Sequence, residues 1–306
     1  MEKINPYLSI VIPVFNEEKN LEELYRRLTL TLDRIGKSYE IIFTNDGSRD
    51  RSSEILYDLH VRKPDQIRVI EFGSNFGQHM AIMAAFERVR GEIVITLDAD
   101  LQNPPEEIAK LIIAMEQGHD VVNTHRENRQ DSWFRRMISK IHNKIRGWMI
   151  PKIKMIDEGC MLRAYRRHIV DLMASTGEAN TFIPALALSY AAHPTEIPVA
   201  HEPRFAGKSN YNFFGLIRYN FDLVTGFSLF PLQIYTLLSL FVISISFLSI
   251  ILLSVLRSPM IFHAMIFFVL GIFLFGLGII GEYIGRIYLE VRKRPRFVIR
   301  KILEKN

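Results

Sequence analysis

The sequence predicts an α/β protein with a doubly wound, mostly parallel sheet, followed by two membrane-spanning helices. Two observations predict the sheet. Short apolar runs rich in β-branched residues alternate five times with segments of helical periodicity, and polar side chains gather where those runs end. A third observation predicts the membrane helices, because two long uncharged stretches follow residue 226 with a short polar turn between them.

The alternating elements can be assigned in chain order. Strands are predicted at Leu8–Val14, Glu40–Thr44, Arg68–Phe72, Ile93–Leu97 and Asp120–Thr124. Helices are predicted over residues 21–35, 51–61, 77–89, 105–117 and 167–173. A sixth strand is expected at Met161–Tyr165, and His193–Glu202 is expected to be extended. Such alternation favours right-handed crossovers between parallel strands.

Two carboxylates, Asp98 and Asp100, follow the strand Ile93–Leu97, with Gln102 close behind them. In an open α/β sheet, ligands bind outside the carboxyl ends of the strands. Carboxylates one residue apart repel each other unless a cation joins them, and oxygen ligands with a nearby amide suit Mg²⁺ or Mn²⁺. A solvated loop in which the aspartates form a turn is the alternative for Asp-x-Asp taken alone.

The residues at the other strand ends indicate which class of ligand the cation would help to bind. No G-x-G-x-x-G follows the first strand, so a dinucleotide cofactor is disfavoured. Asn16, Glu17 and Asp46 stand at strand ends instead. Amides and carboxylates suit a base and a ribose, and a cation suits a diphosphate, so the set indicates a sugar nucleotide.

Two basic segments suggest further contacts. Residues 131–150 place aromatic and aliphatic side chains at helical spacing with Arg and Lys between them, which is typical of a helix on an anionic membrane surface. An ordinary surface helix is the alternative. Arg204 and Lys208 lie in the Gly- and Ser-containing stretch 202–211, from which they can close over a phosphate; a solvated basic loop is the alternative.

The second half of the chain predicts a transmembrane hairpin. Residues 233–256 would form a helix of about 36 Å, against a hydrocarbon core of about 30 Å. Residues 260–281 form a second uncharged stretch, and many Arg and Lys residues follow it. The positive-inside rule then places both termini in the cytoplasm. Two buried helices of a soluble protein are the alternative.

These features predict four regions. A catalytic domain spans residues 1–212, a juxtamembrane amphipathic segment residues 213–231, two transmembrane helices residues 232–286, and a basic cytoplasmic tail residues 287–306. The one cysteine, Cys160, excludes an intrachain disulfide, and the short first apolar run with its proline is not a signal peptide.

Several motifs together resemble one family along the whole chain. IVIPVFNEE, NDGS, ITLDADLQNPPEEI, RFAGKSNY and GEYIGRIYLEVRKRPRF are similar to the family 2 glycosyltransferases of the GT-A fold. Within that family the chain resembles the polyprenyl-phosphate glycosyltransferases, relatives of dolichol-phosphate mannose synthase. NRQDSWFRR and GCMLRAYRRHIVD look most like the undecaprenyl-phosphate 4-deoxy-4-formamido-L-arabinose transferases of lipid A and lipopolysaccharide modification, a route to antibiotic resistance.

The resemblance implies a role for each matching residue. The uridine would contact Pro13, Asn16, Glu17 and Asp46, and the nucleotide would also contact Asp98. The cation, Mg²⁺ or Mn²⁺, would bind Asp100 and Gln102, and the diphosphate would bind Arg204 and Lys208. The acceptor phosphate would bind Arg135 and Ser139, with Arg126 nearby. The chain departs from the family where Asn45 precedes Asp46, because the usual pair is Asp-Asp, and where Phe15 replaces a frequent Tyr.

The resemblance also implies the reaction, which is inverting transfer of a sugar from a UDP-sugar to undecaprenyl phosphate at the cytoplasmic membrane of a bacterium. The acceptor phosphate has a second pKa near 6 and needs positioning more than a general base. Expected partners are the UDP-sugar, the lipid phosphate, membrane lipids and further copies in a tetramer, with no nucleic acid. Glucosyl or mannosyl transfer to the same lipid is one alternative, and an inactive membrane scaffold that binds nucleotides is another.

Overall fold

The structure is a computed structural model that describes residues 5–126, 157, 160–176, 182–203, 205, 241, 260–291 and 295–305. The chain divides into two units. The first consists of Met1–Ser139, Lys152–Asn210 and Pro295–Asn306, and the second of Lys140–Pro151 and Tyr211–Arg294. The predicted helix 131–150 and the juxtamembrane segment 213–231 lie outside the described residues.

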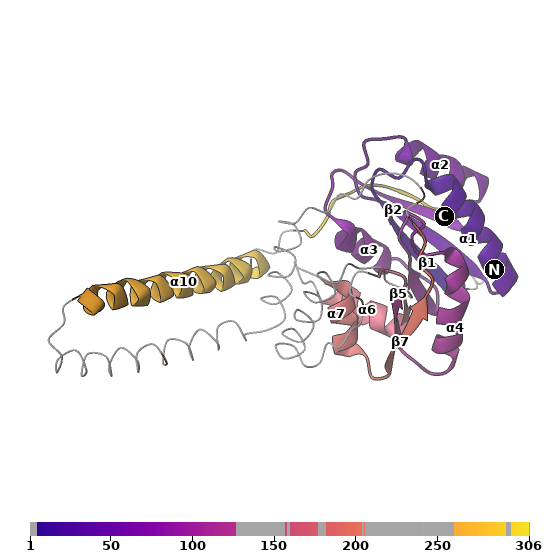
Figure 1. The fold of residues 1–306 in the computed structure, drawn as a ribbon. Helices are drawn as coiled ribbons and strands as arrows, with labels where there is room; N and C mark the ends of the chain where they lie inside the picture. Colours follow the sequence, from indigo (N-terminus) through magenta and orange to yellow (C-terminus); the bar gives the residue numbers. More distant parts are fainter. Residues whose placement is uncertain are drawn as a thin grey trace. The chain divides into compact units, whose positions relative to one another are not determined.

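The first unit is built on one sheet of eight strands (Figure 1). In chain order the strands are β1 Leu8–Val14, β2 Tyr39–Asn45, β3 Ile67–Phe72, β4 Ile93–Thr96, β5 Val121–Arg126, β6 Arg163–Arg166, β7 Pro194–Val199 and β8 Ile299–Leu303. Their order in the sheet is β7-β5-β6-β4-β1-β2-β3-β8. The five predicted strands and the two expected extended segments are therefore all present.

The helices other than α7 fall within or beside the predicted ranges, and α7 was not among the predicted helices. They are α1 Leu21–Ile35, α2 Ser52–Arg62, α3 Gln78–Phe86, α4 Ile108–Glu116, α6 Arg167–Ser175 and α7 Ile183–Tyr190, with a 3₁₀ turn at Pro105–Glu107 before α4. Helix α1 ends at Gly36, whose φ of +70° is the left-handed conformation typical of a helix terminus. In the second unit, helix α10 spans Met260–Val291.

The parallel part of the sheet is β4-β1-β2-β3, in which each neighbouring pair runs parallel. The predicted fifth parallel strand is not the next neighbour, because β6 lies between β4 and β5 and pairs antiparallel with both. Two antiparallel pairings restore the direction, so β5 still points the same way as β4. The sequence predicted a strand here but not its position in the sheet, since four residues do not reveal a direction or a partner.

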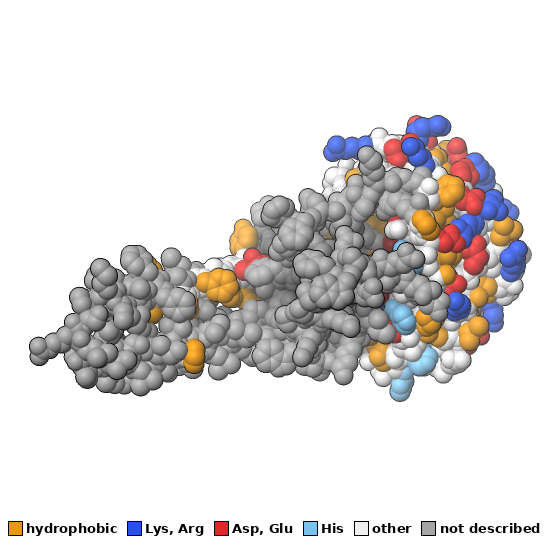
Figure 2. Space-filling model, viewed as in Figure 1, with side chains coloured by type: hydrophobic (Ala, Val, Ile, Leu, Met, Phe, Trp, Pro, Cys, Tyr) orange, Lys and Arg blue, Asp and Glu red, His pale blue; other side chains and the backbone are white. Residues whose placement is uncertain are grey.

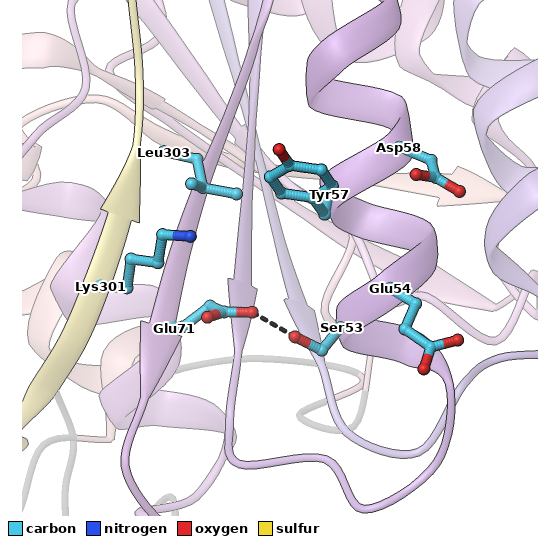
Figure 3. Close-up of a pocket in the computed structure, with 7 residues that line it drawn as sticks. All are labelled: Ser53, Glu54, Tyr57, Asp58, Glu71, Lys301 and Leu303. Atoms are coloured by element: carbon cyan, nitrogen blue, oxygen red, sulfur yellow. Dashed lines mark hydrogen bonds between the residues drawn. The ribbon is translucent and has the colours of Figure 1, made fainter.

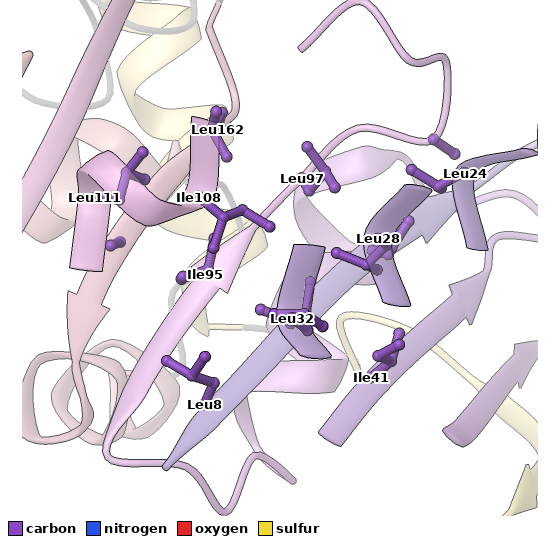
Figure 4. Packing of buried hydrophobic residues seen from close by; sticks show 14 of the residues in the cluster. Leu8, Leu24, Leu28, Leu32, Ile41, Ile95, Leu97, Ile108, Leu111 and Leu162 are labelled. Atoms are coloured by element: carbon purple, nitrogen blue, oxygen red, sulfur yellow. The ribbon is translucent and has the colours of Figure 1, made fainter. Parts of the chain in front are cut away.

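Two hydrophobic clusters cover the two faces of this sheet. On one face, strands β1, β2 and β4 pack against α1, α2 and α4; on the other, the core includes residues of α3, α6 and α7. Figure 4 shows the first cluster, in which Leu24, Leu28 and Leu32 of α1 face the strands and Leu32 lies between Leu8 and Ile41. Burial on both faces explains why the central strands are continuous apolar runs.

The C-terminal residues differ from the prediction. Residues 287–306 were expected to form a separate basic tail, but Ile299–Leu303 is strand β8, which pairs antiparallel with β3. The expected tail therefore contributes a strand to the sheet of the first unit. Its apolar residues stand among Arg and Lys side chains, and exposed charges of that kind are common on the edge strand of a sheet.

The predicted transmembrane hairpin is not found among the residues that the structure describes. In the part of the chain that is described, no helix combines the length and the apolar character that crossing a membrane requires. Apart from Phe241, the first predicted stretch, residues 233–256, lies outside the described residues. The second, residues 260–281, falls within helix α10.

A buried ion pair joins β2 and β3 and reaches the C-terminus. Arg68 donates to Glu40 at 3.0 Å and to Glu304, just after β8, at 2.7 Å. Glu40 also accepts from the Ser9 hydroxyl at 2.6 Å and from the Arg90 backbone N–H at 2.7 Å. The side chains of Arg68 and Glu40 are only 8% and 5% exposed, and Arg68 is the cation that compensates the buried charge of Glu40.

Ion pairs on the surface of the first unit are different in kind. On the face in Figure 2, basic and acidic side chains are interspersed over the part of the domain that is coloured by type. Arg62 on α2 pairs with Glu22 on α1 at 3.1 Å, and both side chains are about half exposed. Pairs of this type contribute about 0–1 kcal/mol.

We therefore expect Arg68→Met to lower the free energy of unfolding by about 3–5 kcal/mol, because it leaves Glu40 as an uncompensated buried charge. Arg62→Met is the matched control, and its cost should stay below about 1 kcal/mol. Urea denaturation followed by circular dichroism measures both. An equal decrease in the free energy of unfolding of the two variants would contradict a larger contribution of the buried pair.

Candidate active site

The strand ends that were predicted to form the site lie at one edge of the sheet. Strand β1 pairs in parallel with β2, where Val14 stands opposite Asn45, and with β4, where Val11 stands opposite Thr96. The loops that follow these three strands therefore begin side by side. They contain Asn16 and Glu17 after β1, Asp46 after β2, and Asp98, Asp100 and Gln102 after β4.

The first two loops are held together by side chains that bond to backbone groups. The Asn16 N–H donates to the Ser48 hydroxyl at 3.0 Å, and the Asn16 side-chain oxygen accepts from the Arg49 N–H at 2.8 Å. The Glu17 N–H donates to the Ser52 hydroxyl at 3.0 Å. Asn16 has a φ of +56°, which Asn tolerates better than most residues. Asn16 therefore fixes the shape of this edge.

Asp46 organises a third loop. Its carboxylate accepts from the backbone N–H groups of Phe76 at 2.7 Å and Gly77 at 2.9 Å, in the connection from β3 to α3. Burial raises the pKa of Asp46, and the two N–H bonds oppose part of that rise. Gly47 has a φ of +68°, and a Cβ atom there would lie 2.6 Å from the Ser74 carbonyl carbon. No larger residue fits this close approach without a backbone shift.

The departure from the family pattern at Asn45 has a local explanation. The Asn45 side-chain oxygen accepts from the Ser48 N–H at 3.0 Å, and Asn45 is only 4% exposed. An Asp carboxylate makes the same turn, so the change from Asp to Asn keeps this bond and removes one buried negative charge. Pro13 is buried within β1 and stands opposite Thr44 of β2.

The two aspartates after β4 differ in their surroundings. Asp98 is partly exposed and accepts from the Gln78 side-chain amide at 2.5 Å. Asp100 is 7% exposed and accepts from the Gln102 N–H at 3.1 Å. Between Asp100 and Gln102, Leu101 has a φ of +61°, which is a rare conformation for a bulky residue. Its side chain is buried in the core, which holds the strained loop in place.

Sequence reasoning did not find His201, which the structure brings close to Asp100. Burial lowers the pKa of His201, as does Arg126, whereas Asp100 and Asp157 raise it. The next residue, Glu202, donates its N–H to the Gln102 carbonyl at 2.9 Å. The stretch was expected only to be extended, because a lone His before Glu-Pro gives no signal of its own.

The other predicted site residues have mixed outcomes. Arg126, predicted to lie near the acceptor phosphate, forms two hydrogen bonds with the buried Asp157, at 2.6 and 3.0 Å. Arg135, Ser139, Arg204 and Lys208 lie outside the described residues.

The donor set at this edge fits a hard divalent cation in part. Asp98 and Asp100 offer carboxylate oxygens, and Mg²⁺ or Mn²⁺ often binds through one or two carboxylates with water and substrate oxygens. Within the described ranges, no group of three or more His, Cys, Asp or Glu residues is arranged to hold a metal. The Gln102 side chain, substrate oxygens and water could supply further ligands.

A hollow in the first unit lies away from these aspartates. It has a volume of about 330 Å³ and is lined by Ser53, Glu54, Tyr57, Asp58, Glu71, Lys301 and Leu303 (Figure 3). These residues belong to α2, β3 and β8, and β3 is three strands away from β4. The Lys301 ammonium lies 5.5 Å from the Tyr57 ring centroid. This hollow is not part of the candidate active site.

The comparison with protein families now identifies the class. Residues 9–172, more than half of the chain, match glycosyl transferase family 2, and the chain belongs to that family. The matched range contains β1 to β6 and the polar loops after β1, β2 and β4. The protein is therefore a glycosyltransferase, and its first unit is an α/β domain of the GT-A type.

Solved structures agree with this fold. One is glucosyl-3-phosphoglycerate synthase from Mycobacterium tuberculosis in complex with Mn²⁺, UDP-glucose and phosphoglyceric acid; it has a TM-score of 0.51 and 15% identity, and the match covers 72% of this chain and 78% of that chain. The same enzyme with Mg²⁺ and UDP also gives 0.51 and 15%, with 72% and 77% covered. Similarity at this identity establishes the fold alone.

A histidine in helix α3, next to the residue that binds Asp98, has an unusual environment. His79 follows Gln78 in α3, and its ring packs edge-on against Phe182 with 5.4 Å between the centroids. Its Nδ1 atom is buried and has no hydrogen-bond partner among the described residues. Burial, with a smaller effect from Arg163, lowers the pKa of His79 to about 4.

This pKa predicts a pH-dependent loss of stability. Below about pH 6.5 the unfolded chain binds a proton at His79, and the folded protein binds it only near pH 4, so stability falls as the pH falls between these values. At pH 5 the loss should be about 2 kcal/mol. His79→Phe keeps the ring contact. Between pH 7 and pH 5 its free energy of unfolding, measured by urea denaturation, should fall by about 2 kcal/mol less than that of the wild type. Parallel slopes for the two proteins would contradict the assignment.

Proposed function

We propose that this glycosyltransferase transfers a sugar from a UDP-sugar to a polyprenyl phosphate, with inversion at the anomeric carbon. The observation that supports it most directly is the pair Asp98 and Asp100 at the end of β4, beside the interlocked loops after β1 and β2. Glucosyl-3-phosphoglycerate synthase, which shares the fold, has been crystallised with UDP and a divalent cation, and this supports the same donor class here.

In this proposal Asp100 and Gln102 hold Mg²⁺ or Mn²⁺, and Asp98 contacts the nucleotide. The cation would neutralise charge on the leaving diphosphate. The buried turn from Asp100 to Gln102 fixes the carboxylate in advance, because the Gln102 N–H already bonds to it. Arg204 and Lys208 would add positive charge to the diphosphate, a role that rests on the sequence resemblance.

The nucleotide would lie over the loops that contain Asn16, Glu17 and Asp46. Both carboxylate oxygens of Asp46 already accept backbone N–H groups, so Asp46 would act chiefly by shaping the loop that receives the base. The side-chain oxygen of Asn16 is likewise bonded to Arg49. Pro13 would contribute through its rigid backbone, since its side chain is buried.

The acceptor phosphate would attack the anomeric carbon directly, forming the new C–O bond as the bond to UDP breaks. A phosphate monoester with a second pKa near 6 is mostly dianionic at neutral pH and needs no strong base. Arg135 and Ser139 would position it. Arg126 would contribute less than the resemblance implies, because Asp157 already neutralises it.

A lipid acceptor requires a membrane location, and the support for that comes from the sequence. We propose that residues 232–286 form a transmembrane hairpin, that residues 131–150 lie at the interface, and that the catalytic domain faces the bacterial cytoplasm. We also propose assembly as a tetramer.

For the sugar we propose 4-deoxy-4-formamido-L-arabinose, on the resemblance of residues 128–136 and 159–171. A pocket for it must bond the formamido group, because a buried amide without partners costs about 1–3 kcal/mol. The candidates for this pocket are the polar groups of residues 158–163 and 178–181. Arg163 lies in the first stretch, but it is fully buried and bonds to the Cys160 carbonyl and to Asn123, so it is committed to the core. The other candidate stretch, residues 178–181, lies outside the described residues.

The cation role predicts the effect of Asp100→Ala. Turnover should fall by about a hundredfold or more, and UDP affinity should lose its dependence on Mn²⁺. Asp58→Ala, at an exposed position of α2, is the control and should change neither quantity. Calorimetric UDP titrations with and without Mn²⁺ measure the second effect. Near-normal turnover of Asp100→Ala in saturating Mn²⁺ would exclude Asp100 as a metal ligand.

The donor proposal predicts the outcome of a competition. The purified protein receives UDP-glucose and the UDP-linked formamido-pentose together, with undecaprenyl phosphate in membranes. We expect the lipid product to contain the formamido-pentose, because a pocket that bonds the amide disfavours a hydroxyl and a hexose adds a C6 group. Mass spectrometry identifies the product. A glucosylated lipid would leave only the broader polyprenyl-phosphate assignment, and no lipid product would contradict the acceptor.

A further inference from the structure

The stretch after β7 is fastened to the loop that contains the two aspartates. The Glu202 N–H donates to the Gln102 carbonyl at 2.9 Å, and the Phe205 N–H donates to the Asp100 carbonyl at 3.5 Å. The Ala200 N–H donates to the Glu107 carboxylate at 3.2 Å. Residues 200, 202 and 205 are therefore hydrogen-bonded to the 100–107 loop, which contains the expected cation ligands.

Arg27 of helix α1 joins both stretches from outside. It donates to the Glu202 carboxylate at 3.0 Å and binds Glu106 through two bonds, at 3.0 and 2.8 Å. The Arg27 side chain is only 18% exposed, although both glutamates are about half exposed. Its neighbours Leu24 and Leu28 are fully buried, so α1 provides a rigid base.

The charges explain why this arrangement matters. Glu106 and Glu202 both lie within hydrogen-bonding distance of one guanidinium, so without it two negative charges would face each other. Repulsion would then separate residue 202 from the 100–107 loop, and the bond to the Gln102 carbonyl would weaken. The Arg27 fork satisfies both carboxylates at once, which the single ammonium of a Lys does less well.

We propose that Arg27 is a positioning residue for the cation site, one that holds the Glu202 segment against the Asp100–Gln102 loop. The inference rests on the proposed function, because it assigns the cation to that loop. Arg27 itself touches neither the nucleotide nor the metal in this proposal. It acts by fixing the backbone that presents Asp100 and Gln102.

The test compares Arg27→Met with Arg26→Met in the full-length protein. Arg26 is the matched control, since it is 60% exposed and forms its ion pair with Glu23 of its own helix, while its electrostatic effect on Glu106 is smaller than that of Arg27. Mn²⁺ is titrated at fixed UDP by calorimetry. We expect Arg27→Met to need about fivefold more Mn²⁺ for half-maximal UDP binding, corresponding to about 1 kcal/mol, with turnover recovering at saturating Mn²⁺. Arg27→Lys should be intermediate, and Arg26→Met should match the wild type.

Amide hydrogen exchange of the metal-free protein gives a second readout that does not depend on UDP. In Arg27→Met the peptides that contain residues 200–205 should exchange faster than in Arg26→Met. Wild-type Mn²⁺ dependence together with unchanged exchange would overturn the proposal. If Arg27→Met does not fold, Arg27→Lys decides between the same outcomes. UDP binding that is independent of cations in the wild type would instead contradict the proposed function, and hydrogen exchange would still decide the positioning role.

Discussion

The main-chain ladder of β1 with β2 and β4 is the interaction on which the rest of the catalytic domain depends. Strand β1 is buried along its whole length and runs parallel to both neighbours. Parallel pairing places the three carboxyl ends at one edge, and helices on both faces exclude water from the strands. Any shift of register in β1 would move Asn16 and Glu17 away from Asp46 and from the aspartates after β4.

The polar residues at this edge divide into two kinds. One group is Asn16, Asn45 and Asp46, whose side-chain oxygens accept hydrogen bonds from backbone N–H groups of the loops. Asp98 and Asp100 stand on a turn whose strain at Leu101 is maintained by core packing. The first kind builds a rigid frame, and the second presents charge within it. This division explains how Asn45 can replace an aspartate, since its visible task is a turn.

Long-range contacts close the domain at both ends of the sheet. The C-terminal strand β8 covers the edge of β3, and Arg68 binds both Glu40 and, 236 residues further along the chain, Glu304. At the opposite edge of the sheet, β7 is the outermost strand and pairs with β5. The chain leads directly from β7 to His201 and Glu202. The stretch beside the candidate cation site is therefore an extension of the sheet, although it is remote from Asp100 in the sequence.

The sequence by itself determined the first five strands, the helices between them and the family, because apolar periodicity and strand-end motifs are local properties. It also predicted that Asp98 and Asp100 directly follow a buried strand, since two carboxylates after an apolar run form a local pattern. Only the tertiary structure decided that β6 lies antiparallel between β4 and β5, that β8 joins the sheet, and that Arg126 is neutralised by Asp157. It alone brought His201 and Arg27 to the aspartate loop. Partners of this kind are set by packing between distant segments, and no spacing along the chain encodes them.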